Sequence, residues 1–301
     1  MTFRLRKNIS RNIFIIIFLF PALAGFCLFA VYPMLKGMYT SLYNWSGVTS
    51  AMKFIGLRNY TDLIGDPYVL KAFKNEFLVI FWKVILIILT ALFFALALTR
   101  LKLNSREQSF YRVIFFFPNI LSVIIITNIW SFVYHPTIGI LNTGLEAIGL
   151  QRFWHAWLGE PETVLGALIP VTCWAGVGLF MIIFIAAIKG IPEELFESTI
   201  IDGANEWQQL IRIIIPMIWE QIKFSVITII ISTFGTTSVF VIAMTQGGPD
   251  NASQVVGSYI YELNFNQYRA GYATALGVVL FLVVLIITGI TNKLMNKEID
   301  V

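Results

Sequence analysis

The chain is poor in charged residues and in the residue types that form disulfides or bind metals. Its 301 residues include only two cysteines and two histidines, and Asp, Glu, Lys and Arg together make up 13%. Cys27 and Cys173 each fall inside an apolar run, which argues against a disulfide framework or a zinc site. His135 and His155 stand isolated in one loop, so we expect no metal site there.

Two further absences narrow the function. The phosphate-cradling motif G-x-x-x-x-G-K-[ST] does not occur, so the chain cannot itself be a nucleotidase of that type. No basic stripe with interleaved aromatic residues is present, so we expect no nucleic-acid partner. Candidate acids, bases and metal ligands are nearly absent from the apolar runs, which disfavours a membrane-embedded enzyme. We therefore expect no catalytic residue and no cofactor bound by this chain.

Apolar residues, by contrast, dominate. They make up 57% of the chain, and the mean hydropathy is +0.78, whereas soluble domains are roughly 45–50% apolar. Runs long enough to cross a membrane of roughly 30 Å as helices occur near 13–35, 77–98, 113–134, 163–188, 222–245 and 272–292. The first run exceeds the roughly 7 to 15 residues of a signal peptide and is interpreted as an uncleaved span. The pattern predicts an all-α, polytopic membrane protein with six spans in one domain, 1–301.

Basic residues give the orientation, because they concentrate in short cytoplasmic loops. They precede the first span and follow the second, at Arg4, Arg6, Lys7, Arg11, Arg100, Lys102, Arg106 and Arg112. Both termini are then cytoplasmic. Segments 36–76, 135–162 and 247–270 are expected outside, and the first of these, although it carries five basic residues, is interpreted as a small folded cap.

The cytoplasmic segment between the fourth and fifth spans has its own pattern. Pro192 suits the start of a helix that reaches Ile201, and Asp202-Gly203 is a stop signal before a second helix over 204–215. The second helix has an apolar stripe at three- and four-residue spacing, formed by Trp207, Leu210, Ile211 and Ile214. We name this helix-turn-helix segment, residues 192–216, the elbow. Either lipid alone covers the stripe, or a protein partner does.

The run IPEELFESTIIDGANEWQQLIRIIIP resembles the coupling-helix signature of inner-membrane permease subunits in binding-protein-dependent ABC importers. The matching positions are Glu197, Asp202, Gly203, Ala204, Trp207, Ile213 and Pro216. Shorter stretches resemble the carbohydrate-importing, maltose-type branch over nearly the whole chain, including GLRNY at 56–60, YRVIFFFP at 111–118, GGP at 247–249 and GYATA at 271–275. Ser198 and Thr199 replace two alanines of the signature, and Ile215 replaces a leucine.

This resemblance implies the type I ABC importer permease fold in a bacterial cytoplasmic membrane. The partners it implies are a second homologous permease, two ABC ATPase subunits that bind ATP and Mg, and an extracellular solute-binding protein. The elbow would dock on an ATPase. Glu197 and Asp202 would make polar contacts, Gly203 would supply the turn, and Ala204 would allow close approach. The chain itself would be a transport subunit and not an enzyme.

Polar residues inside the spans are candidates for a solute pathway, because such groups are costly in a bilayer. By residue type they include Ser122, Thr172, Ser232 and Thr233, and by resemblance Asn119, Trp174, Gly176, Thr236 and Thr237. Hydroxyl, amide and indole groups suit a sugar, and we rank Trp174 first. Helix packing is the alternative role for each. Another polar solute, such as glycerol phosphate or sialic acid, is the alternative substrate.

Other residues of the spans predict local structure, and the scarcity of acidic residues narrows the class of transporter. Gly176, Gly178 and Gly235 permit close helix approach. Pro118 and Pro170 interrupt the backbone hydrogen bonds locally. Lys83 either reaches the outer interface or pairs with a neighbour. The spans are almost without Asp and Glu, which argues against an ion-driven secondary transporter.

Overall fold

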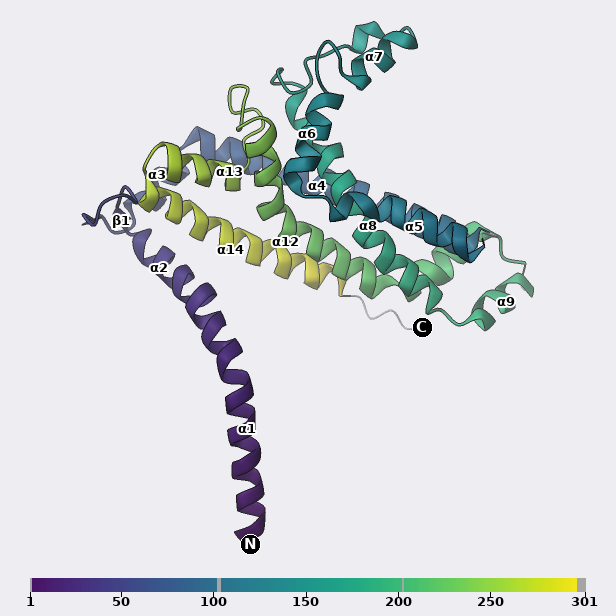
Figure 1. The fold of residues 1–301 in the computed structure, drawn as a ribbon, viewed down its shortest axis with the longest axis horizontal. Helices are drawn as coiled ribbons and strands as arrows, with labels where there is room; N and C mark the ends of the chain where they lie inside the picture. The colour runs from purple at the N-terminus through teal and green to yellow at the C-terminus, as the bar shows by residue number, and fades with distance from the viewer. Residues whose placement is uncertain (1, 102–103, 202, 297–301) are drawn as a thin grey trace. The chain divides into compact units, whose positions relative to one another are not determined.

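The chain folds almost entirely into helices. The computed structural model describes residues 2–101, 104–201 and 203–296 (Figure 1). They divide into two compact units, one made of Met1–Gly65 with Ile260–Leu280 and the other of Asp66–Tyr259 with Phe281–Val301. The prediction of an all-α chain is confirmed for the described residues, with one two-stranded hairpin as an addition.

The first unit contains the N-terminal helices and a small folded cap. Its elements are α1 (Thr2–Phe26), the π turn Cys27–Val31, α2 (Tyr32–Thr40), the hairpin β1 (Tyr43–Asn44) with β2 (Lys53–Phe54), α3 (Arg58–Ile64) and the first part of α14 (Ala270–Met295). The buried Asn59 side chain donates to the carbonyls of Ser41 at 2.7 Å and Tyr43 at 3.0 Å. These bonds fasten α3 to the hairpin, so the expectation of a folded segment here is confirmed.

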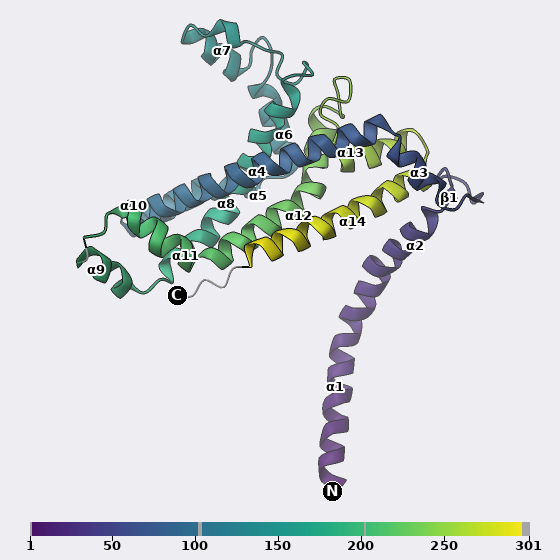
Figure 2. The same cartoon turned by 180° about the vertical axis from the view of Figure 1, so that it is seen from behind.

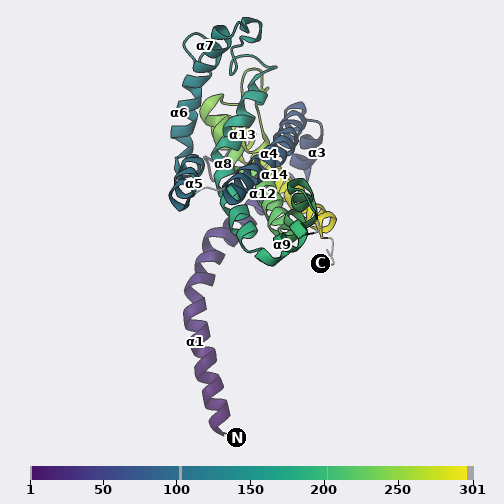
Figure 3. The same ribbon diagram turned by 90° about the vertical axis from the view of Figure 1, so that its right-hand side faces the viewer.

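The second unit is built around three long helices. Its elements are α4 (Pro67–Arg100), α5 (Ser105–Ile120), α6 (Val123–Val133), α7 (Ile140–Ala147), the 3-10 turn Gln151–Phe153, α8 (Val164–Lys189), α9 (Glu193–Ile201), α10 (Glu206–Gln209), the π turn Leu210–Ile214, α11 (Ile215–Met217) and α12 (Trp219–Met244). The helix α13 (Val256–Tyr261) and the π turn Glu262–Asn266 lead out of it. Figure 2 shows α4, α8 and α12 running side by side, and Figure 3 views them from the end where α9 lies.

The core of this unit forms where α4, α8 and α12 meet. Ala91 and Ala95 of α4 are fully buried, and they let α8 approach closely enough to place Met181 and Phe184 in the same cluster. Small residues at helix crossings are how membrane helices maximise packing, since lipid offers no hydrophobic driving force between helices. The cluster continues through Ile229 of α12. The three helices therefore form the rigid frame on which the site residues are mounted.

The membrane spans follow the apolar runs with one break. Within the described residues, five helices are long and apolar enough to cross a membrane, and a sixth span exists if α5 and α6 count as one. These two helices meet at an angle of 99°. The break falls at Leu121 and Ser122, which are both extended, and the Ser122 hydroxyl caps α6. The run at 113–134 is thus two helices, whereas α8 continues unbroken past Pro170.

Candidate functional site

Gly203 forms the turn of the elbow as predicted. Its φ of +76° is left-handed, and no atom lies within 4 Å of the position of a Cβ atom. The N–H of Ala204 donates to the carbonyl of Thr199 at 2.9 Å. This is the long bond of a Schellman closure, which ends a helix with a glycine just past its last turn. The end of α9 at Ile201 agrees with the predicted end of the first elbow helix.

The second elbow segment is less regular than predicted. The Asn205 side chain accepts from the N–H of Gln208, and the Gln208 side chain accepts from the N–H of Asn205, both at 2.9 Å. This capping box starts the segment at Glu206, later than the expected 204. After Gln209 the chain passes through a π turn into the short α11, so 204–215 is not one α-helix.

The expected apolar stripe of the elbow divides into a buried part and an exposed part. Ile214 is 2% exposed and joins the core, and Leu210 packs against it. Trp207 is 68% exposed, and Ile211 is also exposed. A π turn shifts side chains around the helix axis, because each turn holds an extra residue. The prediction of a single continuous stripe was therefore wrong.

Arg100 is a residue of the elbow site that the sequence analysis treated only as a topology marker. It lies in the last turn of α4, where its guanidinium donates to the Gln209 side-chain oxygen and stacks over the Phe196 ring at 4.5 Å. One side chain thus contacts both α9 and α10. Arginine suits this position because its planar group can stack and donate at once.

The other elbow residues are placed as follows. Glu197 lies exposed on α9, Ala204 is half-buried, and Pro216 lies in α11 just before α12. Trp207 lines a hollow of about 540 Å³ together with Phe93, Leu96, Ala97, Arg100, Leu101, Glu206, Leu210 and Ile214. Asp202 lies outside the described residues. The elbow therefore presents an exposed apolar surface beside the end of α4.

A second candidate site is a cavity of about 320 Å³ within the bundle. Its polar lining comes from four helices: Lys83 of α4, Asn119 of α5, Thr172 of α8, and Thr228, Ser232 and Thr236 of α12. Gly176 also lines it, where a Cβ atom would lie 3.4 Å from the Ile87 methyl group. Asn119, Gly176 and Thr236, predicted from the sequence, are thus brought together. Asn119 also donates to the Ala175 carbonyl at 3.1 Å.

Four predicted pathway residues lie outside this lining. Ser122 caps α6, and the Thr233 hydroxyl donates to the Ile229 carbonyl at 2.6 Å. Thr237 is fully buried, and its hydroxyl has no hydrogen-bond partner among the described residues. Trp174 lies edge-on to Trp130, with 5.9 Å between ring centroids. Ser122, Thr233 and Trp174 thus contact their own or neighbouring helices in this structure.

Lys83 does not reach the membrane surface. Its side chain is 5% exposed, and its ammonium donates to the Thr236 hydroxyl at 3.4 Å inside the cavity.

The expectation that glycines permit close helix approach is met at one position and not at another. A Cβ atom on Gly178 would lie 2.6 Å from the Phe115 carbonyl oxygen, whereas one on Gly235 would meet nothing within 4 Å. Close helix approach is confirmed at Gly178, and the expectation was wrong at Gly235, where α12 has open space.

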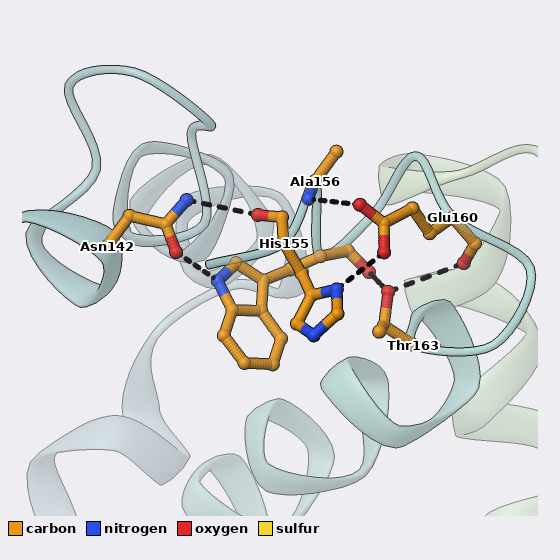
Figure 4. A network of polar contacts seen from close by, with 6 residues as sticks. Asn142, His155, Ala156, Glu160 and Thr163 are labelled. Carbon is orange, nitrogen blue, oxygen red and sulfur yellow. Dashed lines mark hydrogen bonds and ion pairs between the residues drawn. The ribbon is translucent and has the colours of Figure 1, made fainter. Parts of the chain in front are cut away.

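The segment between α6 and α8 is held by a polar network (Figure 4). The Asn142 amide donates to the His155 carbonyl at 3.0 Å and accepts from the Trp157 indole at 2.7 Å. Glu160 accepts from the Ala156 N–H at 2.8 Å and contacts the His155 ring at 2.7 Å. The Ala156 N–H, followed by the His155 ring, holds the pKa of Glu160 below its usual value. His155 is therefore not isolated, as the sequence suggested, but paired with a carboxylate.

The start of α4 holds the segment between α12 and α13. Asn75 donates to the carbonyls of Ala252 at 3.0 Å and Gln254 at 2.8 Å, and Glu76 accepts from the Val256 N–H at 3.1 Å. Asn75 and Glu76 are both buried. This segment follows the GGP turn at 247–249, so these bonds give the turn a fixed base.

Comparisons with known proteins identify the family. The family model described as "Binding-protein-dependent transport system inner membrane component" matches residues 108–301. Probable ABC transporter permease protein YurN of Bacillus subtilis (strain 168) is 34% identical over 271 residues, which cover 89% of this chain and 91% of that protein. Diacetylchitobiose uptake system permease protein NgcF of Streptomyces coelicolor is 35% identical, over 94% of this chain and 82% of that protein.

The fold is also that of a solved importer. A crystal structure of a bacterial ABC transporter involved in the import of the acidic polysaccharide alginate matches with a TM-score of 0.83, at 24% identity, over 99% of this chain and 100% of that one. The arrangement of the helices is thus that of a known membrane fold. The chain belongs to the family of binding-protein-dependent transport system inner membrane components.

Proposed function

We propose that this chain is the permease subunit of an ABC importer that moves a sugar or oligosaccharide across a bacterial cytoplasmic membrane. Relatives named for sugars support the substrate class, among them NgcF and the multiple sugar-binding transport system permease protein MsmF of Streptococcus mutans, which is 29% identical. The observation that carries the permease role is the elbow, because it exposes large apolar side chains on either side of a glycine turn. The cavity supports the substrate class through its hydroxyl and amide groups.

The elbow is the proposed connection to a cytoplasmic ATPase. Ile201 is 86% exposed and Trp207 is 68% exposed. Both side chains would face water if no partner covered them. Large exposed apolar side chains that lie together mark a contact with a protein or with a membrane. Gly203 provides the turn and Arg100 fixes α9 to α10, so the elbow moves as one piece. Glu197 and Asp202 supply polar contacts at its edge, Ala204 permits close approach, and Pro216 joins the elbow to α12.

This assignment sets the orientation and the partners. Both termini face the cytoplasm, and the hairpin cap, the α7 region and the GGP turn face outside, where a solute-binding protein docks. A second, homologous permease completes the pore. Two ABC ATPase subunits bind ATP and Mg, and closure of their dimer moves the elbow and opens the pore outward. Hydrolysis then returns the pore to its inward-facing state.

The sugar passes through the cavity between α4, α5, α8 and α12. Asn119 and Thr236 offer hydrogen bonds from opposite helices, and Gly176 keeps the wall open. Ser122, Trp174, Thr233 and Thr237 belong to the same pathway in other states of the cycle, when the bent α5–α6 pair and α12 rearrange. Trp174 provides an indole face that can cover the apolar side of a sugar ring.

Co-purification with the ATPase tests the proposal. The Trp207→Ala variant should lose the co-expressed ATPase subunits, or lose the stimulation of ATP hydrolysis by the loaded binding protein. Trp82→Ala is the matched control, because Trp82 is an exposed tryptophan on α4 far along the helix from Arg100. If no ATPase co-purifies with the wild-type chain, or if Trp207→Ala behaves like Trp82→Ala in both assays, the coupling role is wrong.

A further inference from the structure

The most unusual group in the second unit is the buried ammonium of Lys83. It lies in the interior of α4, a candidate membrane span, and its side chain is 5% exposed. An ionisable side chain within a bilayer is expensive, and where one occurs it generally faces a pathway or a partner. Lys83 faces the cavity, and it is the one charged side chain among the described residues that line it.

Within the described residues, Lys83 has a neutral hydrogen-bond partner but no ion-paired carboxylate. An ammonium has three donors, and the hydroxyl of Thr236 fills one of them at 3.4 Å. That hydroxyl donates its own proton to the Ser232 carbonyl at 2.9 Å, so it offers Lys83 only a neutral lone pair. No carboxylate in the described part of the chain lies within 4 Å of the ammonium.

Glu76, seven residues earlier on the same helix, interacts electrostatically with Lys83 but forms no ion pair with it within 4 Å. Seven residues span roughly 10 Å along an α-helix. One Glu76 oxygen accepts from the Val256 N–H at 3.1 Å, which fastens it to the segment before α13. The other Glu76 oxygen is buried without a hydrogen-bond partner among the described residues, while Lys83 lines the cavity.

We propose that Lys83 is the specificity-determining residue of the passage cavity and that the solute it selects is an acidic saccharide, one that carries a carboxylate. This inference rests on the proposed function and deepens it. A carboxylate both neutralises the ammonium and accepts charge-assisted hydrogen bonds, which are roughly twice as strong as neutral ones. The hydroxyl groups of a neutral sugar carry no charge and would not neutralise the buried ammonium. Asn119, Ser232 and Thr236 then take the hydroxyl groups of the same solute.

The test compares acidic and neutral saccharides of the same skeleton. The complete importer, with its partner permease, ATPase subunits and solute-binding protein, is reconstituted in vesicles. Uptake is measured for short oligosaccharides of galacturonate against galactose and of glucuronate against glucose. The wild type should take up the acidic member in preference. Lys83→Met, which keeps the length of the side chain without its charge, should lower uptake of the acidic member on the order of tenfold or more.

Two control variants separate the role of the cavity from the charge of the chain. Lys83→Arg should retain most of the uptake of the acidic member. Lys74→Met removes the same charge from an exposed position on α4 and should change neither uptake. Equal uptake of both members, unchanged in Lys83→Met, overturns this inference and leaves the proposed function standing. A loss of both alike in Lys83→Met also overturns it, because the lysine then pairs with another subunit. Uptake of neither member by the wild type also overturns this inference, whereas the proposed function is tested separately by co-purification with the ATPase.

Discussion

The close crossing of α5 over α8 at Gly178 predicts that a larger residue there lowers the free energy of unfolding. In Gly178→Ala the new Cβ atom would lie 2.6 Å from the carbonyl oxygen of Phe115 and 2.7 Å from the Cα atom of Phe116. Both are backbone atoms, so no side chain can rotate out of the way and α5 must shift. Overpacking of this kind costs about 1–3 kcal/mol. The higher helix propensity of alanine offsets about 1 kcal/mol of it.

The matched control is Gly235→Ala in the middle of α12. A Cβ atom there meets nothing within 4 Å outside its own helix, so only the propensity gain remains. The free energy of unfolding, measured in bicelles by denaturant or by steric trapping, should fall by up to about 2 kcal/mol for Gly178→Ala, which places this variant about 1–3 kcal/mol below Gly235→Ala. It should stay level or rise by up to about 1 kcal/mol for Gly235→Ala. A Gly178→Ala variant that is as stable as Gly235→Ala would refute the close crossing.

Three further predictions concern the fixed points around the bundle. Asn75→Ala removes two hydrogen bonds, each worth about 1 kcal/mol net. Amide hydrogen exchange over 248–256 should therefore become faster. Lys74→Ala, at an exposed position, is the control and should leave this exchange unchanged. Arg100→Ala should expose 193–210 to protease and exchange, and Arg100→Lys should rescue it only in part because an ammonium does not stack as a guanidinium does. The pKa of Glu160 is lower in the folded loop than in the unfolded chain, where a carboxyl has a pKa of about 4.3. The hydrogen bonds of its carboxylate therefore stabilise the loop fully above that pH. This contribution is lost as the pH falls through the lower folded pKa. Exchange protection of the Ala156 N–H should therefore decline on acidification in the wild type, and Glu160→Gln should flatten that dependence.

Local signals in the sequence were sufficient for the elements that depend on neighbouring residues. The apolar runs located the long helices, and Pro192 and Gly203 placed the boundaries of α9, because a helix end is decided by a few adjacent residues. Asn205 with Gln208 is another such signal, and the capping-box pattern would have moved the second elbow segment to its observed start. The turn at Gly203 could thus be predicted from its chain neighbours alone.

Features that depend on packing could not be predicted in this way. The 99° bend between α5 and α6 follows from extended backbone at Leu121 and Ser122. Pro118, three residues earlier, indicated a local interruption of the backbone hydrogen bonds but not a bend of this size, since α8 continues unbroken past Pro170. Lys83 and Arg100 acquire their roles from partners more than a hundred residues away, Thr236 and Gln209. Gly178 and Gly235 look alike in the sequence, and only the position of α5 distinguishes them.

A cross-link tests most directly whether the elbow connects this chain to an ATPase. A photoreactive residue replaces Ile201, which is 86% exposed at the end of α9, in the full importer. The same residue replaces Ile64 as the control, since Ile64 is 78% exposed at the end of α3. We expect an adduct with the ATPase subunit from position 201 and none from position 64. An adduct from position 64, or adducts with lipid alone from position 201, would contradict it.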